Sequence, residues 1–77
     1  MEIRIRIYGD LRKFVRSGRR SVALELPSGA TVGDAVKAVG IPPEAPRVTL
    51  LGGRRAPDAA ALNPDLELVL FSPVAGG

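Results

Sequence analysis

The sequence predicts an α+β domain in which one main helix packs on one face of a mixed β-sheet, and three observations predict it. Apolar and polar residues alternate at residues 3–7, and leucine recurs at every second position of residues 66–70, as strands with one face on the core require. A single longer stretch, after Thr31, has the apolar spacing of a sizeable helix. At 77 residues the chain can build one small core, so this helix has to bury its apolar side against the sheet.

The N-terminal part of the sequence predicts a strand, a short helix and a second strand. The first strand covers Glu2–Tyr8 and is broken at Gly9, and Asp10 is the expected N-cap of the short helix. Residues 21–26 alternate again, so we expect a second strand that pairs antiparallel with the first. The side chains expected to face the core are Leu11, Phe14 and Val15 of the helix and Val22, Leu24 and Leu26 of the strand.

The main helix is bounded by recognisable signals at both ends. Thr31 is the expected N-cap, and Asp34 three residues later can complete a capping box while its charge suits the positive end of the helix dipole. Gly40 stands where a glycine with positive φ commonly ends a helix. The predicted apolar stripe consists of Val32, Ala35, Val36 and Val39.

The second half of the sequence predicts short strands separated by turns. After a stiff, proline-rich connection at residues 41–46, the expected elements are a strand at Val48–Leu51, a turn at Gly52 and Gly53, a brief edge strand at 54–57, a helical turn at 58–62, a turn at 63–65 and a last strand at 66–71. This order favours the β-grasp, or ubiquitin-like, architecture, in which the first and last strands lie side by side at the centre of the sheet.

The last strand predicts a candidate docking surface. If Leu66, Leu68 and Leu70 pack under the helix, Val69 and Phe71 point to the opposite sheet face, beside Arg6 and Tyr8 of the first strand. An apolar patch with arginine at its rim is typical of a docking surface. The structural alternative is that Val69 and Phe71 are there for their strand propensity alone.

The chain closes with Val74, Ala75, Gly76 and Gly77 after Pro73. Proline cannot continue a β-ladder, so we expect a β-grasp domain at residues 1–72 and a flexible Gly-Gly tail at 73–77. Glycine has no Cβ, and a Gly-Gly end can therefore thread a narrow channel in a partner with its carboxylate leading.

Composition restricts the chemistry of the chain. It contains no cysteine and no histidine, which excludes thiolate nucleophiles, histidine acid–base pairs and the common zinc sites; we expect no catalytic residue, no metal and no bound cofactor. No apolar run predicts a membrane span or a signal peptide, so we expect a cytoplasmic protein. The net charge of +3 is modest, and the basic residues at 12–20 lack the aromatic side chains of a nucleic-acid site.

Three segments carry a family resemblance, at residues 5–12 (IRIYGDLR), 26–34 (LPSGATVGD) and 71–77 (FSPVAGG). Together they resemble the small subunit of molybdopterin synthase, the MoaD-like branch of the ubiquitin-like sulfur carriers. The resemblance covers nearly the whole chain, and its most specific part is the Pro-Val-Ala-Gly-Gly end.

The resemblance implies a function for the tail. In such carriers a partner adenylating enzyme uses ATP to activate the terminal carboxylate, here on Gly77, and a sulfur donor protein then converts it to a thiocarboxylate. The large subunit of molybdopterin synthase takes up the tail and uses the sulfur to build molybdopterin. Gly76, Ala75 and Val74 would be recognised along the channel.

Three other functions stay open. The thiocarboxylate could supply tRNA thiolation, thiamine synthesis or cysteine synthesis. The chain could instead be a modifier joined through Gly77 to lysines of target proteins. It could also be an interaction domain with an idle tail that binds an acidic partner through residues 12–20.

Overall fold

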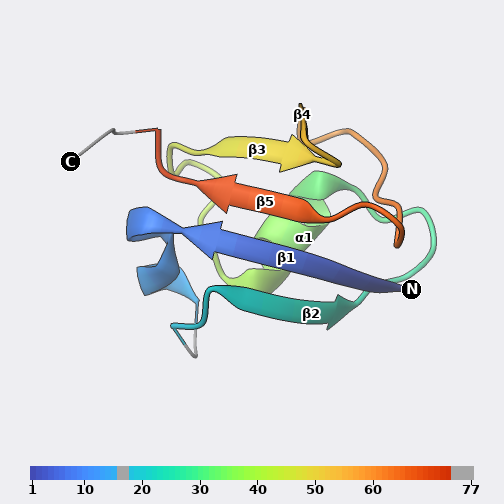
Figure 1. Ribbon diagram of the computed structural model, residues 1–77, viewed down its shortest axis with the longest axis horizontal. Helices are drawn as coiled ribbons and strands as arrows, with labels where there is room; N and C mark the ends of the chain where they lie inside the picture. Colours follow the sequence, from blue (N-terminus) through green and yellow to red (C-terminus); the bar gives the residue numbers. More distant parts are fainter. Residues whose placement is uncertain (16–17, 74–77) are drawn as a thin grey trace.

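The computed structural model describes residues 1–15 and 18–73. Its elements are β1 (Glu2–Tyr8), the 3-10 helix η1 (Gly9–Phe14), β2 (Ser21–Glu25), α1 (Val32–Val39), β3 (Val48–Leu51), β4 (Arg54–Arg55) and β5 (Leu68–Phe71) (Figure 1). The predicted bounds of the first strand and of the strand before the Gly-Gly turn are confirmed. The other strands are shorter than predicted.

The five strands form one mixed sheet in the order β2-β1-β5-β3-β4. β1 and β5 run parallel at the centre, and the remaining neighbours are antiparallel. The predicted central pairing of the first and last strands is therefore confirmed. β3 and β4 are joined by Gly52 and Gly53, both with positive φ, as a tight two-residue hairpin turn requires.

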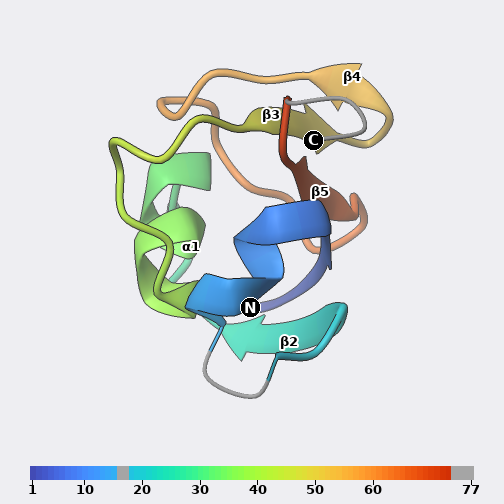
Figure 2. The same cartoon turned by 90° about the vertical axis from the view of Figure 1, so that its left-hand side faces the viewer.

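α1 lies across one face of the sheet, and the core fills the space between them (Figure 2). The predicted alternation of β1 is confirmed, because Ile3, Ile5 and Ile7 are all fully buried. The predicted helix stripe is confirmed as well. The buried core residues that α1 and β5 contribute are Val32, Ala35, Val36, Val39, Leu68 and Leu70.

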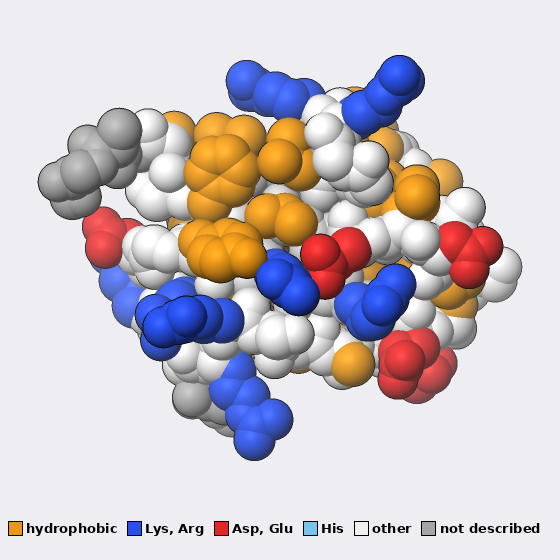
Figure 3. Space-filling model, viewed as in Figure 1, with side chains coloured by type: hydrophobic (Ala, Val, Ile, Leu, Met, Phe, Trp, Pro, Cys, Tyr) orange, Lys and Arg blue, Asp and Glu red, His pale blue; other side chains and the backbone are white. Residues whose placement is uncertain are grey.

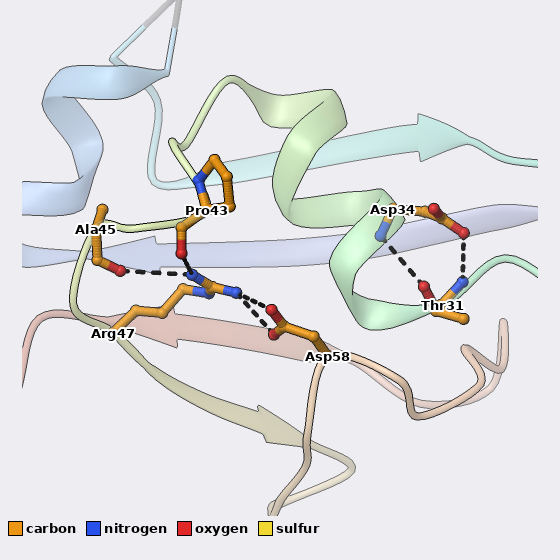
Figure 4. Close-up of polar contacts among 6 residues, drawn as sticks. All are labelled: Thr31, Asp34, Pro43, Ala45, Arg47 and Asp58. Atoms are coloured by element: carbon orange, nitrogen blue, oxygen red, sulfur yellow. Dashed lines mark hydrogen bonds and ion pairs between the residues drawn. The ribbon is translucent and has the colours of Figure 1, made fainter.

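At both ends of α1, backbone groups form the capping hydrogen bonds that the sequence predicts. The Thr31 hydroxyl accepts a hydrogen bond from the Asp34 N–H at 3.3 Å, and the Asp34 carboxylate accepts one from the Thr31 N–H at 2.9 Å (Figure 4). At the other end Gly40 has φ of 101°, and its N–H donates to the Lys37 carbonyl at 3.1 Å. These contacts occupy backbone groups that a helix leaves unpaired at its ends.

A buried arginine side chain joins the connections before and after the β3–β4 hairpin. The Arg47 side chain is 8% exposed, and its Nη2 lies 2.6 Å from Oδ2 of Asp58 (Figure 4). Its Nη1 donates to the Pro43 carbonyl at 3.2 Å and to the Ala45 carbonyl at 3.4 Å. The proline-rich connection is thus fastened to the segment that follows β4.

One local prediction is wrong and another holds only in part. Asp10 does not cap η1: the N-cap is Tyr8 without a side-chain bond, because Gly9 at φ 69° turns the chain directly from β1 into η1. Of the helical turn predicted at 58–62, a single turn forms, in which the Ala60 N–H donates to the Pro57 carbonyl at 3.0 Å, and no helix continues to Leu62. The carbonyls of Asp58 and Ala60 instead accept hydrogen bonds from the first N–H groups of α1, on Gly33 and Val32.

Leu66 does not face the core, contrary to the prediction. It is 38% exposed, and its N–H closes a turn by donating to the Asn63 carbonyl at 3.0 Å. The turn draws Leu66 out of the strand, so β5 begins at Leu68 and the Leu66 side chain lies over Gly52 instead.

Candidate functional site

The predicted tail residues Val74, Ala75, Gly76 and Gly77 lie outside the described residues. The described chain ends at the root of the tail, where β5 stops at Phe71 and Ser72 and Pro73 follow. Ser72 is half-buried against the turn at Gly9, where a Cβ would lie 3.5 Å from the Ser72 Cβ. The root of the tail therefore starts from the centre of the sheet, beside the end of β1.

The predicted docking residues are brought together on the sheet face opposite α1. The parallel register pairs Val69 with Arg6 and Phe71 with Tyr8, and paired residues have side chains on one face. Tyr8 is 41% exposed, while Val69 and Phe71 are half-buried.

Two further apolar residues on this face were missed by the sequence prediction. The β3–β5 register pairs Val48 with Phe71 and Leu50 with Val69, and both β3 side chains are half-buried outside the core cluster. We call Tyr8, Val48, Leu50, Val69 and Phe71 the outer patch. Figure 3 shows it as a largely continuous apolar area on this face. The alternation within β3 carries the signal, but its phase is ambiguous because Thr49 is the residue that faces the core.

Arg6 is held in place at the rim of the outer patch. Its Nε donates to Oε2 of Glu67 at 2.9 Å, and its Nη1 lies 3.5 Å from the Tyr8 hydroxyl. The hydrogen bond to Tyr8 and then the Glu67 carboxylate raise the pKa of the Arg6 guanidinium above its ordinary value. The rim thus keeps a fixed positive charge, next to one acidic side chain, at every pH the protein meets.

A mainly apolar hollow of about 330 Å³ lies at the root of the tail, between η1 and the proline-rich connection. It is lined by Leu11, Phe14, Ala45 and Ser72, among others, and its charged lining residues are Asp10, Lys13 and Glu44. The outer patch and this hollow lie on either side of the tail root. A partner that holds the tail would find apolar surface next to it.

The basic residues before β2 are partly engaged in local structure. Arg12 donates to the Gly18 carbonyl at 3.3 and 3.4 Å, and the Lys13 ammonium lies 5.3 Å from the centre of the Phe14 ring. Within residues 1–15 and 18–73, no helix is long and apolar enough to cross a membrane. The same part of the chain contains no acidic cluster that could hold a metal ion.

Comparison with known proteins adds a family and several structural relatives. Residues 1–65 match the family model described as Mut7-C ubiquitin. The chain is similar to the crystal structure of SAMP1 from Haloferax volcanii, with 28% identity, a TM-score of 0.76 and complete coverage, 100% of both chains. A second crystal structure, of H. volcanii small archaeal modifier protein 1, gives 26% identity and a TM-score of 0.76 over 95% of this chain and 98% of that one.

A more distant structure shares the fold alone. The putative molybdopterin converting factor, subunit 1, from Pyrococcus furiosus is 19% identical, with a TM-score of 0.76 over 96% of this chain and 99% of that one. No curated protein sequence matches the chain.

The predicted fold class is confirmed by both kinds of comparison. The five-stranded mixed sheet with one main helix is the β-grasp, ubiquitin-like fold. The family match extends from Met1 through the turn before β5, and so includes the whole of α1 and four of the five strands. The chain belongs to the Mut7-C ubiquitin family.

Proposed function

We propose that the chain is a ubiquitin-like carrier whose Gly77 carboxylate is activated by an adenylating enzyme and converted to a thiocarboxylate. As the small subunit of molybdopterin synthase, it would donate this sulfur to molybdopterin synthesis on the large subunit. Similarity to SAMP1 over the full length supports a carrier or modifier function, and the resemblance of the Pro-Val-Ala-Gly-Gly end supports the sulfur pathway.

The observation that carries the proposal is the position of the tail root beside the outer patch. Phe71 is both the last residue of β5 and a member of the outer patch, next to Tyr8 in the parallel register. A partner that covers the patch therefore holds the tail by its base. Because the base belongs to a central strand, its position is fixed by hydrogen bonds on both sides.

The proposed chemistry lies in the partner enzymes. A carboxylate oxygen of Gly77 attacks the α-phosphorus of ATP, and pyrophosphate leaves. A donor then delivers sulfur at the oxidation level of sulfide, which attacks the acyl carbon and displaces AMP. The chain contains no cysteine or histidine to catalyse either step, so its own contribution is to present the terminus.

A second candidate is a protein modifier, and the similarity to small archaeal modifier protein 1 favours it. Activation of Gly77 is common to both functions. They differ in the acceptor, which is a cofactor precursor in the first case and a lysine of a target protein in the second.

The experiment that tests the proposal is intact-mass spectrometry of the protein purified from its own cells, with fragmentation to locate any change. We expect sulfur in place of oxygen at Gly77, and adenylation of Gly77 when the protein is incubated with ATP and the activating enzyme. Conjugates of higher mass that disappear when Gly77 is deleted would assign the modifier function instead.

The matched control is a variant with one alanine added after Gly77, which leaves residues 1–77 unchanged. It should fold normally and accept neither AMP nor sulfur. A fully active extended variant, or an unmodified terminus after incubation with ATP, sulfur donor and activating enzyme, would rule out the carrier.

A further inference from the structure

The free edge of the sheet at β2 adjoins a hollow with a mainly apolar lining. β2 stands at the end of the strand order, and within the described residues no strand pairs with its other side. A groove of about 550 Å³ runs between β2 and the C-terminal end of α1. Its lining includes Phe14, Val22, Leu24, Ala38 and Val39.

The hydrogen-bond pattern identifies which backbone groups face outward. The N–H of Ile7 donates to Arg20 and the N–H of Leu26 donates to Met1, so Arg20 and Leu26 point their backbone groups toward β1. Antiparallel pairing alternates along a strand, and the one-to-one register extends without a bulge between these two points. Ser21, Ala23 and Glu25 therefore point their N–H and C=O groups away from the sheet.

The side chains between these residues face the groove. Val22 and Leu24 pair with the buried Ile5 and Ile3, so they lie on the α1 side, where both are only half-buried. A strand added to this edge would place every second side chain in the groove beside them. A second hollow, of about 410 Å³, follows the edge itself and is lined by Arg19, Ser21, Val22 and Ala23.

The charge along this edge is uneven. Arg19 and Arg20 are exposed at the start of β2, whereas Glu25 at its end lies 3.3 Å from the ammonium group of Met1, which neutralises it. Figure 3 shows Lys and Arg side chains gathered where β2 begins. An occupant with acidic residues at the β2 start therefore matches the charge of the edge.

From this geometry we propose that the β2 edge and its groove bind an extended segment of a partner protein by strand addition. The segment has apolar residues at alternate positions, which enter the groove, and acidic residues at the end beside Arg20. Among the described lining residues the groove shares only Phe14 with the hollow at the tail root; it shares no residue with the outer patch or the tail, and β1 separates it from β5. It does not depend on the proposed function, and it leaves the tail accessible while the segment is bound.

A defined peptide tests the proposal on the full chain. The probe has two aspartates followed by isoleucine, threonine, valine and threonine, and is blocked at both ends; the control peptide has two lysines in place of the aspartates. Amide NMR should map the acidic peptide to β2 and α1, with binding about tenfold tighter than the control at low salt and a smaller difference at high salt.

Hydrogen exchange gives a second, position-specific readout. The amides of Ser21, Ala23 and Glu25 should exchange fast in the free protein and slow down with the acidic peptide. The amides of Val22 and Leu24 are already bonded to β1 and should change little. Equal binding of both peptides, or changes centred on the outer patch, would overturn the proposal.

Two substitutions separate the backbone edge from the groove. Ala23→Pro removes an N–H that the pairing with β1 does not use, and should abolish peptide binding, whereas Ala23→Thr should retain it. Ala38→Leu keeps a good helix former on an exposed helix position while filling the groove, and should also abolish binding, whereas Ala38→Ser should not.

Thermal unfolding of each variant establishes that it is folded before binding is measured. Normal peptide binding by folded Ala23→Pro and Ala38→Leu would overturn the proposal. Protection of Ser21, Ala23 and Glu25 that rises with protein concentration alone would assign the edge to a second copy of this chain, and would overturn it as well.

Discussion

At the scale of single residues, Gly40 is a position where both the backbone conformation and a close neighbour disfavour any side chain. Its φ of 101° lies in the left-handed region, and a Cβ built there would lie 2.8 Å from the Phe14 carbonyl oxygen. Gly29 has a similar φ of 91° but nothing within 4 Å of its Cβ position. The two glycines thus separate the cost of the backbone conformation from the cost of close approach.

We predict that Gly40→Ala lowers the free energy of unfolding more than Gly29→Ala does. The left-handed conformation alone costs a non-glycine residue about 1–2 kcal/mol, so both variants should lose that much. Gly40→Ala should lose about 1–3 kcal/mol more, because η1 has to move away from the new methyl group. Chemical denaturation of the two variants measures the difference. Equal losses of stability would show that η1 moves away from the new methyl group at no cost.

Single residues also show where prediction from sequence fails. The local pattern predicts Asp10 as an N-cap and Leu66 as a core residue, and both predictions are wrong because a backbone turn, at Gly9 and at Asn63–Leu66 respectively, sets the local geometry. Thr49 is buried on the core side of β3 while Leu50 faces outward, the reverse of their polarity. Local polarity cannot fix the phase of a four-residue strand; its pairing partner does.

At the scale of elements, α1 depends on connections as much as on its own caps. Its first two N–H groups donate to carbonyls of the segment after β4, at 2.9 Å each. The Arg47–Asp58 pair fastens that segment to the proline-rich connection. The capping box was predictable because it is a recurrent sequence pattern. The Arg47 contacts were not, because the pair with Asp58 forms only once the β3–β4 hairpin brings the two residues together, and no sequence motif marks it.

We predict that Arg47→Met lowers the free energy of unfolding by about 1–2 kcal/mol, near the low end for lost hydrogen bonds to buried groups. Methionine retains the apolar stem, and Asp58 is 56% exposed, so water can replace part of what is lost. Arg54→Met, on an exposed edge residue, is the control and should change stability by less than about 0.5 kcal/mol. If the control variant lost as much stability, the Arg47 contacts with Asp58, Pro43 and Ala45 would not be the cause.

At the scale of the whole molecule, one face of the sheet packs in the core and the opposite face is available to contact a partner. The α1 face holds the core, and the outer patch stays partly exposed beside the tail root. This division was predictable from the alternation of β1 and of the last strand. The contribution of Val48 and Leu50 was not, because it depends on β3 lying next to β5.

We predict that Phe71→Ala weakens binding to the adenylating enzyme of the proposed function by about tenfold or more while the domain remains folded, as for an interface anchor. Leu70→Ala is the matched control on the same strand. It opens a cavity under α1 and should cost about 2–5 kcal/mol of stability. Binding affinity and thermal unfolding, measured on both variants, distinguish them. A larger stability loss for Phe71→Ala than for Leu70→Ala would place Phe71 in the core.

The parallel pairing of β1 and β5 also sets how the domain responds to mechanical force. The described chain begins at one end of this central pair and leaves it at the other (Figure 1). Pulling on the tail against the N-terminus would load the inter-strand hydrogen bonds in shear, all at once, because neither strand can be peeled from an edge. An enzyme that pulls on the tail while the N-terminus is held would therefore meet its greatest resistance when it reaches Phe71, the last residue of β5, before any part of the domain unfolds.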